Sequence, residues 1–137
     1  MATAELVESG LIEVQLGDFI EVGEGPRGIR LVVDVTEVNL KSDRVNATLA
    51  ANDAADWGTV SDNGTLMSLD VRFTLKTDDG EYIYVEYCGR GGLTNGLIAA
   101  APTFQTGSEK YSWLNRVQGV IAGQVNLDTG KLVYRLY

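Results

Sequence analysis

The chain of 137 residues has the length of one domain, and its hydrophobic fraction of 45% is enough to build a single core. Its 19 acidic and 11 basic residues give a net charge of −8, which argues against binding to nucleic acid or to an anionic membrane surface. We therefore expect one domain over residues 1–137, with neither nucleic acid nor membrane among its partners.

Histidine is absent, and Cys88 is the only cysteine. The missing histidine removes Ser-His-Asp and Cys-His catalytic groups and most zinc and iron sites, so we expect no metal and no cofactor. A lone cysteine cannot form an internal disulfide, and the N-terminal residues lack the basic and apolar regions of a secretory signal. No apolar stretch approaches the roughly 20 residues of a membrane-spanning helix. These features predict a cytoplasmic protein.

Apolar and polar residues alternate in short runs that Gly, Asn and Asp turns separate. This pattern predicts an all-β, antiparallel fold, either a sandwich or a small barrel. The predicted strands are residues 11–16, 19–22, 29–39, 44–51, 65–77, 81–88, 116–126 and 131–137, with weaker patterns at 6–8 and 96–104. Gly17-Asp18 is expected to be the turn between the first two.

The hairpin of residues 65–88 is the best-defined segment, because its turn contains Asp79-Gly80. An even-numbered loop would pair even positions of the first strand with odd positions of the second. One face would then carry Ser68, Asp70, Arg72, Thr74, Ile83, Val85 and Tyr87, and the other Leu69, Val71, Phe73, Leu75, Tyr82, Tyr84, Glu86 and Cys88.

Asp70 and Arg72 share a face of their strand, about 6.6 Å apart along the backbone. Inside a barrel, Arg72 would orient a ligand carbonyl or carboxylate, and Asp70 or Tyr87 would be its partner. If the leucine face packs the core instead, Asp70 and Arg72 are a solvated ion pair worth little to stability.

Two further groups are candidates for a site. Asp56 beside the indole of Trp57 would have a raised pKa suited to acid–base chemistry, or Trp57 could simply anchor a loop. Tyr111, Trp113 and Asn115 alternate, so on a strand they would share a face suited to a flat, weakly polar ligand, or form part of the core.

Several motifs in order resemble the domain-of-unknown-function family 3237, also called uncharacterised protein family 0311. They are Gly25-Pro26-Arg27-Gly28-Ile29-Arg30, Asp56-Trp57, Leu69-Asp70-Val71-Arg72-Phe73, Asp78-Asp79-Gly80, Pro102-Thr103-Phe104-Gln105-Thr106 and Tyr111-Ser112-Trp113-Leu114-Asn115-Arg116. The resemblance implies a lipocalin-like β-barrel of about 8–10 strands with an internal cavity, often paired as a dimer. It implies no particular reaction. The chain departs from the family at residues 50–55, where a glycine-rich stretch is expected, and lacks a Gly-Gly near Thr36.

Together these observations predict a cofactor-free enzyme of the lyase, isomerase or cyclase type, acting on an apolar or aromatic carbonyl-containing metabolite in the barrel cavity. The predicted catalytic residues are Asp70, Arg72 and Asp56, and the predicted ligand-binding residues are Trp57, Tyr87, Tyr111, Trp113 and Asn115. A non-catalytic carrier of a small apolar ligand and a protein-interaction module are the alternatives. We also expect a homodimer, because both faces of the 65–88 hairpin carry apolar residues.

Overall fold

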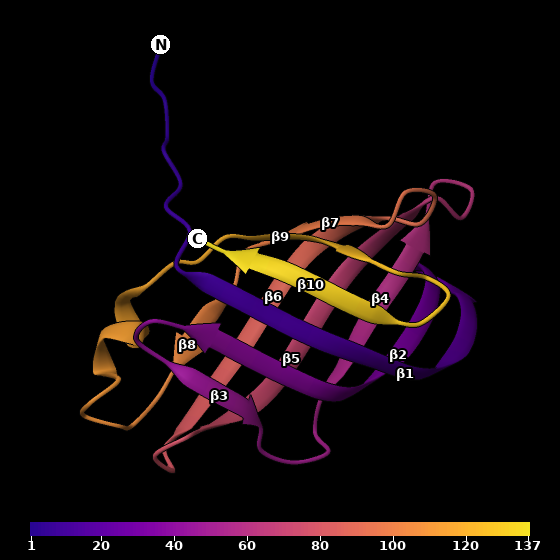
Figure 1. Cartoon of the computed structure of the whole chain (residues 1–137). Coiled ribbons are helices and arrows are strands. Elements are labelled where there is room, and N and C mark those ends of the chain that lie inside the picture. The colour runs from indigo at the N-terminus through magenta and orange to yellow at the C-terminus, as the bar shows by residue number, and fades with distance from the viewer.

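The computed structural model describes all of residues 1–137 and contains ten strands and one short 3-10 helix (Figure 1). The strands are β1 (Gly10–Gly25), β2 (Gly28–Ser42), β3 (Asn46–Leu49), β4 (Ala55–Ser61), β5 (Leu66–Thr77), β6 (Tyr82–Gly92), β7 (Leu97–Ala100), β8 (Thr103–Gln105), β9 (Ile121–Val125) and β10 (Lys131–Leu136), and the helix η1 is Ser112–Arg116. No helix is long and apolar enough to cross a membrane.

The strands close into an antiparallel ring in the order β1-β2-β4-β5-β6-β7-β9-β10 and back to β1. Beyond one end of β4, the short β3 bridges β2 and β5, and β8 pairs with β6. Closure removes the unpaired sheet edges, because every strand of the ring has a neighbour on both sides. The predicted all-β, antiparallel barrel is confirmed.

The interior of the ring is a single apolar core of 24 buried side chains. Alternate residues along each strand point inward, as on β5, where buried and more exposed positions alternate through most of its length. Phe73, Val85 and Tyr134 are among the most deeply buried. An eight-stranded ring is just wide enough for such side chains to fill, with space left for at most one small ligand.

The hairpin between β5 and β6 has the opposite register to the predicted one. Its loop has three residues, Asp78-Asp79-Gly80, because the Thr77 amide donates to the Glu81 carbonyl at 2.8 Å. Gly80 has φ of +91°, which glycine adopts without strain. This odd-numbered loop pairs even positions with even ones, so the predicted face assignment is wrong.

The corrected register moves the predicted charged pair to the outside. Asp70 lies opposite Cys88 and Arg72 opposite Glu86, with their side chains exposed, while Val71 and Tyr87 face the interior. The prediction that Asp70 and Arg72 line the cavity is therefore wrong. The two do not form an ion pair with each other, and the Arg72 guanidinium instead lies 4.4 Å from the centre of the Trp57 ring.

Some predicted elements also differ. Residues 11–16 and 19–22 belong to one strand, β1, because Gly17-Asp18 is a bulge beside β2 and not a turn. Sequence patterns missed β4 and gave a strand at residues 6–8, which are extended but unpaired. The segment predicted as a strand from residue 116 is helical at its start, forms an isolated bridge from Gln118 to Thr103, and becomes a strand only at Ile121.

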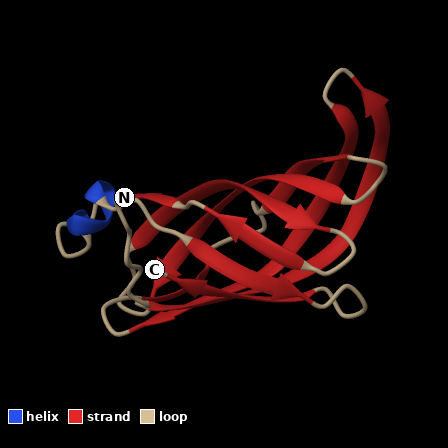
Figure 2. Cartoon of the chain, turned by 90° about the horizontal axis from the view of Figure 1, so that it is seen from above, coloured by secondary structure: helices blue, strands red, loops and turns tan.

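The two ends of the barrel differ. The helix η1 and the loop before it lie at one end, and the β1–β2 hairpin extends past the ring at the other (Figure 2). The helical end is therefore covered, and the end with the hairpin is the open one.

The assignment of faces is tested by Arg72→Leu, which should change the free energy of unfolding by less than about 1 kcal/mol, because an exposed guanidinium over an indole contributes little. Leu75→Ala, on the inward face of the same strand, should cost about 2–5 kcal/mol. Denaturant unfolding of both variants beside the wild type measures the two changes. A loss of several kcal/mol in Arg72→Leu would contradict the register.

Candidate functional site

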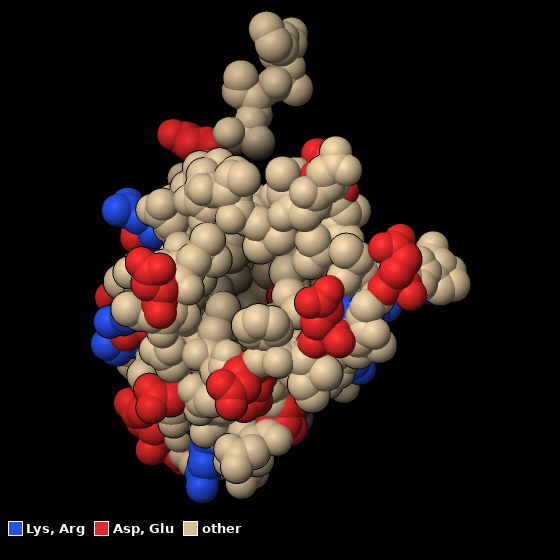
Figure 3. Space-filling model, turned by 90° about the vertical axis from the view of Figure 1, so that its right-hand side faces the viewer, with Lys and Arg blue, Asp and Glu red and all other residues tan.

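The open end of the barrel contains a cavity of about 390 Å³. Figure 3 views the molecule from this end and shows a hollow at its centre with acidic side chains around it. The wall comes from the β1–β2 hairpin, from β4 and β5, and from the turns before β7 and β10. Its apolar side chains are Leu16, Phe19, Leu31, Val33, Met67, Leu69, Leu93, Val125 and Leu127.

Carboxylates are the only charged groups that line the cavity. Asp56 contributes from β4, and Asp128 contributes from the β9–β10 turn. No lysine or arginine is among the lining residues, so the cavity favours neutral or cationic molecules over carboxylates and phosphates. Nowhere in the chain do three or more Cys, Asp or Glu side chains gather closely enough to hold a metal ion.

Asp56 lies where the pairing of β4 with β5 is interrupted. The strands pair at Asp56–Val71 and again at Thr59–Ser68, but not between these positions. In the gap, the Asp70 amide donates to Oδ1 of Asp56 at 3.0 Å, so the carboxylate replaces a backbone acceptor.

Two neighbouring residues maintain this gap. The Trp57 carbonyl accepts from Nη1 of Arg30 at 2.7 Å, which satisfies a group that the interrupted strand pairing leaves free. A Cβ at Gly58 would clash with Cε of Met67, and it would lie 3.1 Å from the Ser68 carbonyl oxygen and 3.2 Å from Oδ1 of Asp56. Glycine at position 58 therefore makes room for the carboxylate beside the backbone.

The surroundings of Asp56 make it a candidate acid–base group. Its side chain is 7% exposed. Burial raises its pKa from 3.8 to about 6, although the Asp70 amide opposes the rise and the Asp70 carboxylate adds to it. Both protonation states are then populated close to neutral pH, as a group that accepts and returns a proton requires.

Two tyrosines lie in the core near Asp56. Asp56, Val71 and Tyr87 are adjacent across β4, β5 and β6, and the Tyr87 ring meets that of Tyr134 edge to face at 5.9 Å. Burial raises the pKa of both phenols, so they stay neutral. The Tyr134 hydroxyl is fully buried and has no hydrogen-bond partner.

Of the predicted site residues, the structure brings Asp56 and Tyr87 together inside the barrel and Trp57 and Arg72 together on its outer face. Trp57 points outward beneath Arg72. Tyr111, Trp113 and Asn115 belong to the helical end of the chain, away from the open cavity, so their expected place on one strand face is wrong.

The residues at the helical end hold loops together. The Tyr111 hydroxyl donates to Oδ1 of Asp79 at 2.8 Å. Asn115 exchanges two hydrogen bonds with the Thr106 backbone, at 2.8 and 2.9 Å. Trp113 lies under the Arg44 guanidinium, 3.6 Å from the ring centre.

Sequence patterns missed the aliphatic wall of the cavity. Leu16 lies beside the bulge of β1, and Leu93 and Leu127 lie in turns, where an apolar side chain is not expected to line a site. The available signal was the run of large apolar residues after Gly17-Asp18, which continues the strand on the other side of the bulge.

Comparison with known proteins places the chain among relatives of the same fold. A family described as "Protein of unknown function (DUF3237)" matches residues 6–137. A UPF0311 protein of Rhodopseudomonas palustris is 26% identical over 119 residues, covering 75% of this chain and 76% of its own length.

Two crystal structures are also similar. A β-barrel-like protein from Acinetobacter baumannii has 25% identity and a TM-score of 0.82 over 97% of this chain and 94% of its own. An enzyme from Penicillium herquei has 19% identity and a TM-score of 0.64 over 99% of this chain and 100% of its own, a likeness of fold.

The raised pKa of Asp56 predicts a pH-dependent stability. Between about pH 4 and pH 6 the folded chain keeps a proton on Asp56 that the unfolded chain has lost. The stability that this proton gives to the folded chain is complete below the unfolded pKa of 3.8 and disappears above about pH 6. Asp56→Asn keeps an acceptor for the Asp70 amide and removes the titration. Relative to wild type, its free energy of unfolding should be about 2 kcal/mol higher at pH 8 than at pH 4. Urea unfolding across this range measures the difference, and a constant offset would contradict the assignment.

The unpartnered hydroxyl of Tyr134 gives a second prediction. Tyr134→Phe removes a buried polar group without a hydrogen-bond partner, so it should leave the free energy of unfolding unchanged or raise it by about 1 kcal/mol. Thermal and denaturant unfolding provide the measurement. Tyr111→Phe, which removes the donor to Asp79, is the matched control and should be destabilising. A destabilised Tyr134→Phe variant would show that the hydroxyl has a partner in solution.

Proposed function

The chain belongs to the DUF3237 family of proteins of unknown function, and we propose that it is a cofactor-free enzyme of the lyase, isomerase or cyclase type. Its substrate is an apolar or aromatic carbonyl compound bound in the open end of the barrel. The observation that supports this proposal is one buried carboxyl group, Asp56, in the wall of a mostly apolar cavity.

The two oxygens of Asp56 have different surroundings. Oδ1 is held by the Asp70 amide, which orients the carboxyl group. No protein group donates to Oδ2, and this oxygen is not enclosed by protein. Oδ2 is therefore the atom that a bound molecule would meet, and a fixed acceptor in contact with the ligand is the geometry that proton transfer requires.

In the proposed step, the ionised Asp56 takes a proton from the carbon next to the substrate carbonyl. The C–H electron pair forms the enolate double bond, and the carbonyl oxygen takes the negative charge. Asp56 then returns the same proton to another carbon or to that oxygen. The sequence moves one proton and needs no oxidant, metal or second reactant, which suits isomerisation or a ring closure that begins from an enol.

The cavity also supports the proposed class of substrate. Its volume of about 390 Å³ falls within the range of small-molecule sites, about 300–1,000 Å³. The wall offers aliphatic and aromatic contact, and its two charged groups are both acidic, which disfavours an anionic ligand. The enzyme from Penicillium herquei shares the fold, so a barrel of this shape is compatible with catalysis.

A non-catalytic carrier is the second candidate, because the apolar wall would bind a ligand without any chemistry. The two differ in whether Asp56 exchanges protons with the bound molecule. An aromatic ketone with acidic α-hydrogens, 2-tetralone, is a suitable probe for both, since binding and α-hydrogen exchange can be measured on the same sample.

The test measures exchange of the α-hydrogens of 2-tetralone in D₂O by proton NMR, with and without protein. The wild type should accelerate exchange, with a rate that rises with pH through about 6 as Asp56 ionises. Asp56→Asn should reduce the acceleration by a factor of about 10²–10⁴. Asp70→Asn, the same chemical change on the outer face, should retain it.

The outcomes separate the candidates. Binding of 2-tetralone in the cavity without accelerated exchange would identify a carrier. Equal losses in Asp56→Asn and Asp70→Asn would contradict the assignment of Asp56 as the proton-transfer group.

A further inference from the structure

A second and larger depression lies on the outside of the barrel, across the strands β6, β7, β9 and β10. Its volume is about 900 Å³. Ala99 and Ala122 are paired across β7 and β9 in its floor, and their small side chains leave the outer wall hollow. We call this depression the outer groove.

The outer groove is apolar, although it is exposed. Leu97 and Val133, which line it, are 56% and 38% exposed. Contiguous apolar surface of this kind on a soluble barrel marks a place where another surface binds.

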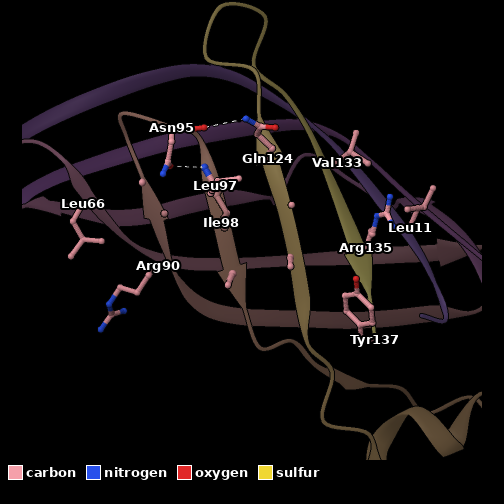
Figure 4. Close-up of a pocket in the computed structure, with 15 residues that line it drawn as sticks. Leu11, Leu66, Arg90, Asn95, Leu97, Ile98, Gln124, Val133, Arg135 and Tyr137 are labelled. Atoms are coloured by element: carbon pink, nitrogen blue, oxygen red, sulfur yellow. Dashed lines mark hydrogen bonds between the residues drawn. The ribbon is translucent and has the colours of Figure 1, made fainter. Parts of the chain in front are cut away.

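The charge of the outer groove is opposite to that of the chain. Arg90 and Arg135 line it, and Figure 4 shows them on opposite sides of the strands that carry Leu97 and Gln124. No acidic residue lines the groove, although the chain has 19. The groove therefore suits an apolar segment with acidic residues at its ends.

The chain contains such a segment. Residues 1–9 are exposed and form no strand, and Figure 1 shows them projecting from the barrel. Within this arm, Glu5-Leu6-Val7-Glu8 places two apolar residues between two acids, and Leu6 and Val7 are 54% and 76% exposed.

The arm begins at the edge of the outer groove. A carboxylate oxygen of Glu8 lies 3.7 Å from Nη1 of Arg135, one of the lining residues. Both the amide and the hydroxyl of Ser9 donate to the Leu136 carbonyl, at 2.8 and 3.2 Å. These bonds fix the base of the arm, from which residues 1–8 extend away from the molecule.

We propose that two copies of the chain associate through their outer grooves, and that each inserts residues 5–7 of its arm into the groove of the other, while Glu8 stays paired with Arg135 of its own copy. Leu6 and Val7 cover the alanine floor, and Glu5 pairs with Arg90. Since each copy carries the arm beside the groove, a two-fold axis satisfies both contacts at once, which is the usual symmetry of a dimer. This proposal concerns the outside of the barrel and does not depend on the reaction in the cavity.

Light scattering on the full chain after size exclusion is the first test. The wild type should have twice the chain mass of 14.8 kDa at micromolar concentration. Ala122→Arg, which fills the groove, and the double variant Leu6→Glu, Val7→Glu, which makes the arm polar, should each be monomeric with an unchanged circular dichroism spectrum. A monomeric wild type would overturn the proposal.

Val22→Glu is the matched control, because Val22 is 67% exposed on the projecting β1–β2 hairpin and does not line the groove. It should remain dimeric. If Val22→Glu dissociates the dimer and the groove and arm variants do not, the interface is the hairpin and the proposal is wrong. If Ala122→Arg dissociates the dimer but the arm variant does not, the copies meet through the groove without exchanging arms, which overturns the arm contact.

A charge exchange tests the proposed pair directly. Arg90→Glu alone and Glu5→Arg alone should each weaken the dimer by about tenfold or more, and the double variant should recover most of the loss, because it restores an opposite-charge pair between copies. Sedimentation measures the three dissociation constants. Additive losses in the double variant would contradict the contact between residue 5 and residue 90.

Discussion

The closed ring of backbone hydrogen bonds determines the surroundings of every other group in this protein. Once β10 pairs with β1, alternate side chains of each strand are enclosed by neighbouring strands on every side. A polar group among them needs a hydrogen-bond partner inside the barrel, because without one its burial destabilises the folded state. Asp56 is held there because the ring is interrupted beside it, so that the Asp70 amide donates to a side chain and not to a strand. The same interruption leaves the carboxyl group a free oxygen.

Alternation of residue types predicted the class of fold, because a half-buried strand needs an apolar residue at every second position. It could not determine which positions of β5 share the buried face with which positions of β6, because that depends on whether the loop has an even or an odd number of residues. Asp79-Gly80 is compatible with both, and one added residue moved Tyr87 to the side of Val71 and Phe73. Asp70 and Arg72 then became surface residues.

The candidate site was predictable only in part. Asp56 was identified from its place beside Trp57, but the physical reason differs, because burial inside the barrel raises its pKa and the indole lies on the other face. Gly58 obscured β4 in the sequence, since glycine disfavours strands, and yet it is the residue that admits the carboxylate. Tyr111 and Asn115 were misplaced because their spacing of two residues suits a strand, whereas the chain forms a 3-10 turn here, whose side chains repeat every three residues.

The β1–β2 hairpin extends beyond the point where β1 pairs with β10. The width of the entrance therefore does not follow from the circumference of the barrel alone. Past Leu16, whose amide bonds to the Gly130 carbonyl, β1 has hydrogen bonds to β2 but none to β10. The bulge at Gly17-Asp18 lies at this point, and beyond it the hairpin is joined to the ring only by β2, whose residues Ile29 to Asp34 pair with β4. Phe19 of β1 and Leu127 of the β9–β10 turn both line the cavity there, and no strand pairing joins the two segments. The width of this side opening therefore depends on the hairpin and the β9–β10 turn, and not on the number of strands in the ring.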